Sequence, residues 1–442
     1  MAFFSTSFFV LLLLCFAITC SAIRTTINAR TTKPKPLLFP LRSQEVSSLS
    51  IPRPTNKLLF HHNVSLTVSL SVGTPPQNVS MVLDTGSELS WLHCNPGHSP
   101  GTSNSPQYFR PNSSASFSTI HCSSPACRSQ TRDLAIPATC DPASHLCHVS
   151  LSYADASSSD GALSADLFRM GESPPVQTFF GCMDSTFDSS DGGAAPSGLL
   201  GMNRGHLSFI SQTATRRFSY CISDRDSSGL LLLGHSDLPF LPLNYTPLVR
   251  LSTPLPYFDS IAYSIQLQGI RVSSTPLPLP KSTFVPDHTG AGQTMIDSGT
   301  QFTFLLGDAY KALKMEFLRQ TREILTILNE PDFVFQGAFD LCFRIRESEP
   351  LPRLPPVVLQ FEGAEVTVSG DRLLYKLSGE RRGRDSVWCF TFGNSDMVPI
   401  SAYVIGHHHQ QNVWVEYDIE NNRVGFAPIR CDVASQRLGL VL

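Results

Sequence analysis

Two short stretches of the sequence each place an aspartate in a tight turn, directly after an apolar run. In the first, Asp84 follows the apolar residues 81–83 and opens the turn Asp84-Thr85-Gly86-Ser87. Glycine lets the backbone fold back on itself, and the hydroxyl and amide groups of such a turn can donate hydrogen bonds to a buried carboxylate. A carboxylate held in this way can serve as a general acid or base. The same turn also ends many ordinary strands, so a single copy does not establish catalysis.

The second stretch repeats the first. Asp297-Ser298-Gly299-Thr300 aligns without gaps on the first turn, 213 residues later, and the match extends until Phe304 stands opposite Trp91. A repeat at this separation indicates two related halves rather than a solenoid, whose units recur every few tens of residues. The two halves can therefore bring two equivalent aspartates to one twofold-like axis.

A further match occurs in each half. Leu199-Leu200-Gly201 ends 117 residues after Asp84, and Val404-Ile405-Gly406 ends 109 residues after Asp297. Two apolar residues followed by glycine predict a strand that crosses behind each aspartate turn. The glycine would let the two backbones approach closely.

Taken together, these motifs resemble those of the pepsin-type aspartic proteases, in particular the plant nepenthesin-like or atypical branch. Three more motifs match this branch: Gln410-Gln411-Asn412, Val415-Glu416-Tyr417-Asp418 and Val424-Gly425-Phe426-Ala427-Pro428. The resemblance covers roughly residues 65–432. It implies an all-β fold, a bilobal pepsin-like double barrel with a few short helices.

The resemblance implies an aspartic endopeptidase in which Asp84 and Asp297 form the catalytic pair. Two carboxylates at close range cannot both ionise, so they share a proton. The charged member would activate water for attack on a peptide carbonyl, while the protonated member would stabilise the oxyanion. Cleavage is expected at acidic pH between bulky apolar residues, and no metal or other cofactor is needed.

The resemblance also assigns supporting roles around the pair. One group of residues should hold the carboxylate oxygens: Gly86, Ser87, Gly299 and Thr300. Thr85 and Ser298 should bond to each other across the two lobes. Residues 149–161 predict a hairpin that matches the flap over the cleft, in which Tyr153 would hydrogen-bond to Trp91; an aromatic residue simply packed in a strand is the alternative.

The predicted flap departs from the branch in one respect. Ala154 and Ala156 stand where the branch usually has glycine. Alanine disfavours positive φ, so the departure bears on the shape or mobility of the hairpin rather than on the fold.

The N-terminal region predicts processing. Residues 1–22 have an apolar core too short for a membrane span and predict a secretory signal peptide. Residues 23–60 predict a pro-segment, with a disordered linker as the alternative. Residues 1–60 carry seven basic residues and one acidic residue, a net charge of +6, whereas the rest holds 26 basic and 35 acidic residues, a net charge of −9. These opposite charges suit a segment that lies over an acidic cleft.

The remaining length exceeds a single compact core and predicts two lobes. We expect the N-terminal lobe at residues 61–245 and the C-terminal lobe at residues 246–442, joined through the proline-rich stretch 235–258. The clearest predicted helix begins with Asp308 as its cap and buries Tyr310, Leu313, Phe317 and Ile324.

Cysteine usage indicates an oxidising compartment. Ten cysteines remain outside the signal peptide, enough for five disulfides. The resemblance implies the pairs Cys342–Cys389 and Cys221–Cys431. Four of the other six cysteines lie in a Ser/Pro-rich insert. The six that stay unassigned are Cys94, Cys122, Cys127, Cys140, Cys147 and Cys182.

Neighbouring histidines raise zinc as an alternative for the insert, but its cysteines lack the paired short spacing of zinc ligands, so no metal is expected. The run His407-His408-His409 predicts a partly exposed turn, because adjacent side chains point in different directions.

Four glycosylation sequons are present, at Asn63, Asn78, Asn112 and Asn244. We expect Asn78 to be sheltered.

A second function class remains open: a secreted pepsin-fold inhibitor or binding protein without catalysis, which would require a broken aspartate pair. A serine hydrolase is disfavoured because the dispersed histidines make no recognisable catalytic triad. The expected partners are polypeptide substrates, with no nucleic acid and no membrane span in the mature protein, which we expect to be a monomer. Secretion is the expected destination, and retention in the endoplasmic reticulum is the alternative.

Overall fold

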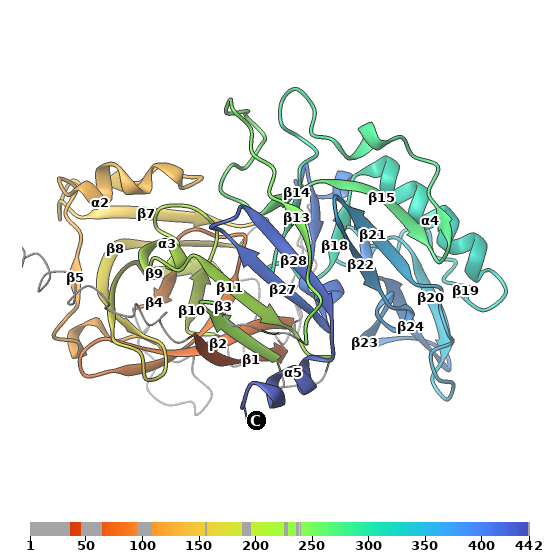
Figure 1. The fold of residues 1–442 in the computed structure, drawn as a ribbon, viewed down its shortest axis with the longest axis horizontal. Helices are drawn as coiled ribbons and strands as arrows, with labels where there is room; N and C mark the ends of the chain where they lie inside the picture. Colours follow the sequence, from red (N-terminus) through yellow and green to blue (C-terminus); the bar gives the residue numbers. More distant parts are fainter. Residues whose placement is uncertain are drawn as a thin grey trace, which may run out of the picture. The chain divides into compact units, whose positions relative to one another are not determined.

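Short strands in several sheets make up most of the structure (Figure 1). The computed structural model describes residues 36–45, 64–94, 108–154, 157–187, 196–224, 229–235, 238 and 240–440. The predicted signal peptide, the sequon Asn63 and the flap residue Ala156 lie outside these ranges. The all-β prediction with a few short helices is confirmed.

The largest sheet among the described residues contains 15 strands. In spatial order these are β13 (Asn244–Pro247), β28 (Arg423–Pro428), β27 (Val413–Asp418), β11 (Arg217–Cys221), β12 (Gly229–Leu233), β1 (Leu37–Glu45), β2 (Val64–Val72), β3 (Gln77–Asp84), β10 (Gly198–Gly201), β4 (Trp91–His93), β9 (Val176–Phe187), β8 (Ser158–Arg169), β7 (Cys147–Ser152) and β6 (Thr139–Cys140), with β5 (Ser118–Thr119) paired to β8. Strand β27, from near the chain's end, lies beside β11, and β28 lies on the other side of β27 (Figure 1). The end of the chain therefore completes a sheet that is built mainly from the first half.

Three smaller sheets belong to the second half. The first consists of β14 (Ser264–Ile265), β17 (Thr294–Ile296), β26 (Tyr403–Ile405), β18 (Thr303–Leu305) and β25 (Phe392–Asn394). The second consists of β16 (Thr275–Pro276), β15 (Leu267–Val272), β21 (Val357–Phe361) and β22 (Ala364–Val368). The third consists of β19 (Thr326–Ile327), β20 (Cys342–Arg346), β24 (Asp385–Phe390) and β23 (Leu374–Arg382).

The helices are short. The α-helices are α2 (Pro125–Arg128), α3 (Phe209–Gln212), α4 (Gly307–Thr321) and α5 (Cys431–Arg437), and the 3₁₀ helices are η1 (Pro111–Ser113), η2 (Gln130–Asp133), η3 (Lys281–Phe284), η4 (Gly370–Arg372), η5 (Ser395–Met397) and η6 (His407–Gln410). No helix of the described part of the chain is long and apolar enough to cross a bilayer.

Helix α4 corrects two details of the sequence prediction. Asp308 lies in its first turn and does not cap it; instead the Gly307 amide donates to Asp396 Oδ1 over 3.2 Å. Ile324 lies beyond the helix and is exposed. The helix therefore ends at Thr321, about one turn before the last residue of the apolar pattern.

The crossing strands appear where the repeat predicts them. Strand β10 runs parallel to β3, with Gly201 opposite Asp84, and β26 runs parallel to β17. A Cβ atom on Gly201 would lie 2.2 Å from the Glu88 carbonyl oxygen, and one on Gly406 would lie 2.2 Å from the Phe302 carbonyl oxygen. Both glycines are therefore required for the close approach of two backbones.

Strand β1 lies within the predicted pro-segment and belongs to the large sheet. It pairs antiparallel with β12 on one side and β2 on the other, and it buries Phe39 and Leu41. None of its residues lines the cleft described below. This part of the segment is thus built into the sheet instead of lying over the cleft, while the boundaries at residues 23–60 stay a prediction.

Five disulfides are present in the described residues. Two are the pairs that the resemblance implies, Cys221–Cys431 and Cys342–Cys389. The other three are Cys94–Cys182, Cys122–Cys140 and Cys127–Cys147. The sequon residues Asn78, Asn112 and Asn244 are exposed, so the expectation that Asn78 is sheltered is wrong. The proposed lobe boundary at 245/246 falls within β13.

Candidate active site

The two aspartate turns hold their carboxylates in the same way. In the first turn the Gly86 amide donates to Asp84 Oδ1 over 2.8 Å, and the Ser87 hydroxyl donates to Oδ2 over 2.5 Å. In the second, the Gly299 amide donates to Asp297 Oδ1 over 2.8 Å, and Thr300 donates to Oδ2 over 2.5 Å. Each carboxyl group is therefore fixed by two donors from its own turn.

Two reciprocal hydrogen bonds join the turns. The Thr85 amide donates to the Ser298 hydroxyl oxygen over 3.1 Å, and the Ser298 amide donates to Thr85 Oγ1 over 2.9 Å. The Ser298 hydroxyl then donates to the Leu83 carbonyl over 2.8 Å. Thr85 and Ser298 are almost completely buried, so water does not compete for these bonds.

This cross-linking brings the two carboxyl groups together. A Cβ atom on Gly299 would lie 2.3 Å from Asp84 Oδ1, and one on Gly86 would lie 2.9 Å from Asp297 Oδ1. Each glycine therefore lies against the aspartate of the other turn, where no side chain would fit. Burial and the nearby charge of Asp297 raise the pKa of Asp84 from 3.8 to about 8. The pair consequently retains a proton well above the usual pKa of a carboxyl group.

The similarity between the two halves extends to the contacts between each turn and the crossing strand behind it. Ser90 and Thr303, each six residues after its aspartate, accept the amides of Gly201 and Gly406 through their hydroxyl oxygens, over 3.0 and 3.2 Å. These two hydroxyl residues were not predicted to belong to the site, although the gapless alignment of the two turns places them opposite each other. They fix each crossing strand to the turn in front of it.

A buried network lies behind Asp297. The Tyr220 hydroxyl donates to Gln410 Oε1 over 2.5 Å, and the hydroxyls of Tyr220 and Tyr417 are 2.9 Å apart. Gln410 Nε2 in turn donates to the carbonyls of Ile405 over 2.7 Å and Asp297 over 3.3 Å. The motif Gln410-Gln411-Asn412 thus has a structural role: its first residue fixes the backbone of the second turn.

The histidine run is more buried than predicted, because His407 and His409 are buried and His408 is partly buried. The prediction of a partly exposed turn is therefore wrong for His407 and His409. The run forms η6, and the amide of His407 donates to the Thr300 carbonyl over 2.8 Å. His409 Nε2 and Nδ1 each lie 2.7 Å from a threonine hydroxyl, those of Thr391 and Thr303. Since Thr391 already donates its proton to a carbonyl, it accepts from Nε2–H, and Nδ1 accepts from Thr303.

This arrangement requires neutral imidazoles. Burial lowers the pKa of His408 to about 4 and that of His409 well below its ordinary 6.5. The Nε2–H group of His408 donates to the Arg372 carbonyl over 3.1 Å. The run therefore contributes packing and hydrogen bonds behind the second turn.

The predicted flap contact is present. Trp91 Nε1 donates to the Tyr153 hydroxyl over 2.6 Å, and Tyr153 follows directly after β7 in the hairpin that β7 and β8 form. Phe304, the counterpart of Trp91 in the repeat, is completely buried among Phe302 and Phe339. It packs in the core and does not line the cleft, although its counterpart Trp91 does.

A cavity of about 1160 Å³ contains both aspartates. Its apolar lining includes Leu199 and Val404 of the two crossing strands, together with side chains that were not predicted to line it: Leu89, Leu151, Met295 and Ile400. They come from strands and loops that are distant in the sequence, so no local pattern marks them. Within the described residues, no group of three His, Cys, Asp or Glu side chains is arranged to hold a metal ion.

Comparisons with known proteins agree with this geometry. Two family models match, "Xylanase inhibitor N-terminal" over residues 66–235 and "Xylanase inhibitor C-terminal" over residues 262–428. The chain is 59% identical to Aspartic proteinase PCS1 of Arabidopsis thaliana over 396 residues, covering 88% of this chain and 86% of that protein. It is 32% identical to Aspartic proteinase nepenthesin-1 of Nepenthes gracilis over 368 residues, covering 82% and 77%.

The buried histidines predict a loss of stability in acid. A histidine with a lowered pKa stays neutral in the folded protein but takes up a proton when the chain unfolds below pH 6.5. Stability is therefore fully present above that pH and declines as the pH falls toward the folded pKa. For His408 alone, the free energy of unfolding should fall by about 2 kcal/mol between pH 7 and pH 5.

Chemical denaturation across this pH range measures the effect. In the variant His408→Gln, whose amide can replace the Nε2 donor without titrating, the slope of stability against pH should become shallower by this amount. The control His288→Asn changes an exposed histidine and should keep the wild-type slope. An unchanged slope in His408→Gln would contradict the assignment.

Proposed function

The chain belongs to the family of pepsin-like aspartic proteases and is an aspartic endopeptidase, and we propose that Asp84 and Asp297 form its catalytic pair. The observation that supports this pair most directly is the packing of each turn's glycine against the other turn's aspartate. Two carboxyl groups can share one proton only if they are held close together, and the absence of side chains at these glycines allows this. The proposed function is hydrolysis of peptide bonds by water bound between the two groups.

The proposed mechanism follows from the asymmetry of the pair. Asp84 is the more completely buried residue and its pKa is raised, so we assign the shared proton to Asp84. Asp297 accepts a proton from the bound water as the water oxygen attacks the carbonyl carbon of the substrate. Asp84 donates its proton to the carbonyl oxygen, so no oxyanion is left uncompensated. Breakdown of the tetrahedral intermediate transfers a proton to the leaving amine and restores the pair.

The non-catalytic alternative is not favoured. The matching family models carry the name of an inhibitor, but the relatives that span most of this chain are named as proteinases. A loss of catalysis would require a change in one of the turns, and both retain the aspartate, the glycine and the hydroxyl donor. The substrates are accordingly polypeptides.

The destination of the protein and its oligomeric state are also proposals. The five disulfides suit an oxidising compartment, and we propose that the protein enters the secretory pathway and is secreted as a monomer. Retention in the endoplasmic reticulum is the competing destination. Immunodetection of the tagged protein in the culture medium against the cell fraction distinguishes the two.

The catalytic pair predicts the effect of two conservative changes. Asp84→Asn or Asp297→Asn should lower peptide cleavage at least 10³-fold, roughly the scale expected when a member of a catalytic unit is removed. Asparagine is nearly isosteric, so the protein should still fold. The control Asp287→Asn changes an exposed aspartate outside the cleft and should cleave like wild type.

Cleavage is measured with a quenched fluorescent peptide, and folding by circular dichroism. Pepstatin, the inhibitor characteristic of the family, should block the wild-type protein. Near-wild-type activity in either asparagine variant would refute the assignment of that residue.

The apolar lining predicts the specificity. The cleft should prefer bulky apolar residues on both sides of the cut, because Leu199 and Met295 lie among the apolar side chains around the pair. Digestion of a peptide library by the mature protein, followed by mass spectrometry, measures this preference. A strong preference for a charged residue next to the cut would contradict it.

The charge separation predicts activation by acid. We expect a precursor that is inactive near neutral pH and is cut before about Phe60 in acid, because acid protonates carboxylates of the net-negative part and leaves the basic residues charged. Strand β1 pairs on both edges, so the fragment that contains it should stay bound after the cut. The cut itself should require Asp84.

A pH series with the purified precursor tests these steps. The new N-terminus is sequenced, and native and denaturing mass spectrometry show whether residues 37–45 remain attached. Full activity of the uncut precursor at neutral pH would overturn the proposal. Cutting of purified Asp84→Asn would overturn self-cleavage alone, and a native form without the fragment would overturn the role given to β1.

A further inference from the structure

The loop of residues 202–207 follows the crossing strand β10 and is hydrogen-bonded to the first aspartate turn. The Met202 amide donates to the Asp84 carbonyl over 2.8 Å. The Asn203 amide donates to the Ser87 carbonyl over 3.0 Å. Because both bonds reach the backbone of the turn, the loop and the turn hold each other in place.

The same loop binds residues 256–262, all of which line the cleft and which we call the wall segment. The Arg204 amide donates to the Ile261 carbonyl over 2.9 Å. The guanidinium nitrogen Nη2 of Arg204 donates to the carbonyls of Ser260 and Ala262, each over 2.7 Å. A single residue of the loop therefore binds three consecutive carbonyls at the end of the wall segment.

The residue after the wall segment, Tyr263, joins the loop to the second aspartate turn. Its hydroxyl is buried and donates to the Met202 carbonyl over 2.8 Å. Its carbonyl accepts the amide of Ile296, which directly precedes Asp297, over 3.1 Å. The loop and the wall segment thus form a second connection between the two turns, in addition to the hydrogen bonds that join the turns directly.

The wall segment has little packing of its own. Phe258 and Ala262 are its only buried residues. Two of its amides donate to the Thr289 carbonyl over 3.0 Å and to Gln293 Oε1 over 2.9 Å, both in the second half of the chain. Among the described residues, the hydrogen bonds that reach the wall segment from the first half all come from Arg204.

Arg204 occupies this position although its side chain loses water there. The Nε–H group is buried and has no hydrogen-bond partner among the described residues. Burial also lowers the pKa of the guanidinium, because water stabilises the charged form. Both effects oppose folding, so the bonds from Nη2 to the wall segment have to offset them. A charged residue that served solubility alone would lie in water instead.

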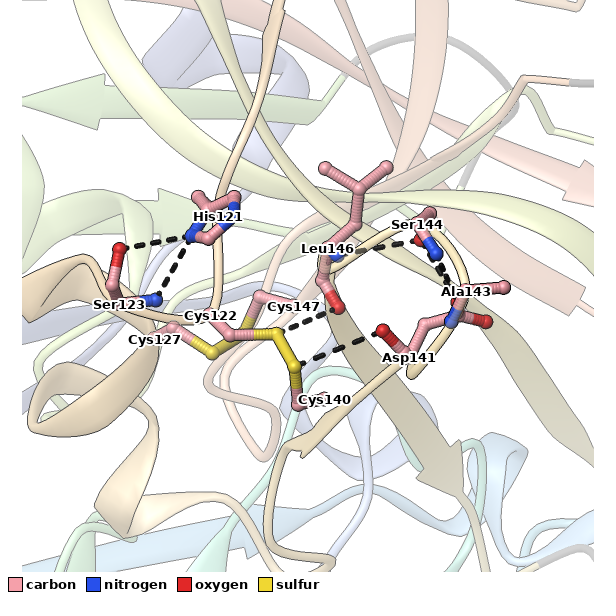
Figure 2. The surroundings of a disulfide bond; sticks show 10 residues. All are labelled: His121, Cys122, Ser123, Cys127, Cys140, Asp141, Ala143, Ser144, Leu146 and Cys147. Carbon is pink, nitrogen blue, oxygen red and sulfur yellow. Dashed lines mark hydrogen bonds between the residues drawn. A yellow bond between two sulfur atoms is a disulfide. The ribbon is translucent and has the colours of Figure 1, made fainter.

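The cysteine-rich insert, residues 122–147, contacts the same loop. Oδ2 of Asp133 in the insert lies 2.5 Å from Nδ1 of His206 in the loop. Figure 2 shows the two disulfides that close the insert, beside the hydrogen-bonded turn at Asp141. Residues 132–136 of the insert line the cleft as well. The loop therefore contacts the first aspartate turn and two separate parts of the cleft lining.

We propose that Arg204 is a positioning residue for substrate binding, which holds the wall segment in place relative to the first aspartate turn. The proposal rests on the proposed function, since it concerns the same cleft. The direct bonds between Thr85 and Ser298 keep the two turns together without Arg204. Loss of the Arg204 side chain should therefore weaken the binding of a peptide and leave the chemical step unchanged.

Two substitutions test this role. Arg204→Met removes the guanidinium and keeps most of the aliphatic stem, so KM for a peptide that spans the cleft should rise about tenfold while kcat stays within about twofold. Arg204→Lys keeps the charge but lacks the planar fork, so KM should rise less, by about threefold. The pH profile of kcat should match that of wild type in both variants, because neither change touches the aspartate pair.

A quenched fluorescent peptide with several residues on each side of the preferred cut measures both constants, and circular dichroism verifies folding. Arg216→Met makes the same change at an exposed arginine outside the cleft and should leave kcat and KM unchanged. If Arg204→Met fails to fold, the KM of Arg204→Lys decides. A residue that only stabilised the fold would lower the amount of active protein, and hence the apparent kcat, without changing KM.

A binding measurement separates this proposal from the assignment of the aspartate pair. Calorimetry with a peptide whose scissile amide is replaced by a methylene-amine needs no catalysis, so its outcome does not depend on whether Asp84→Asn is inactive. Arg204→Met should bind this peptide about tenfold more weakly than wild type. Unchanged binding together with an unchanged KM would overturn the proposal, as would a fall in kcat at unchanged KM.

Discussion

Two hydrogen bonds between Thr85 and Ser298 hold the two aspartate turns together, and the proposed chemistry depends on them. They join turns that lie 213 residues apart, in a region from which water is excluded. Because each turn also binds its own carboxylate, fixing one turn against the other fixes the two carboxyl groups relative to each other. A shared proton is a consequence of that distance, since two unscreened negative charges could not remain so close.

The surrounding structure stabilises this costly arrangement from behind. Crossing strands with glycines, the hydroxyls of Ser90 and Thr303, and the network through Tyr220 and Gln410 satisfy buried backbone groups that would otherwise cost about 1–3 kcal/mol each. The buried His409 accepts the hydrogen bond of Thr303 behind the second turn only while its ring is neutral. Acid therefore favours the protonated pair and the proposed maturation but weakens the scaffold, which sets a lower limit to the useful pH.

The sequence allowed the fold and the two turns to be predicted because their signals are local and repeated: Asp, hydroxyl and glycine at fixed spacing, each after an apolar run. The same signal, extended by six residues, already contained Ser90 and Thr303. The burial of His409 could not be predicted, since it depends on threonines brought in from β18 and from the residue after β24. The place of β1, the burial of Phe304 and the insert's position at the cleft likewise depend on contacts between distant segments, which no local pattern encodes.

The central claim is that the cross-linked turns hold Asp84 and Asp297 so that they share one proton. Neutron diffraction from deuterated crystals of the ligand-free mature protein near pH 5 measures this directly. We expect one deuteron on the pair, carried by Asp84, and two deuterons at the hydroxyls of Ser87 and Thr300 that point toward the carboxylates. Deuterons on both carboxyl groups, or on neither, would contradict it.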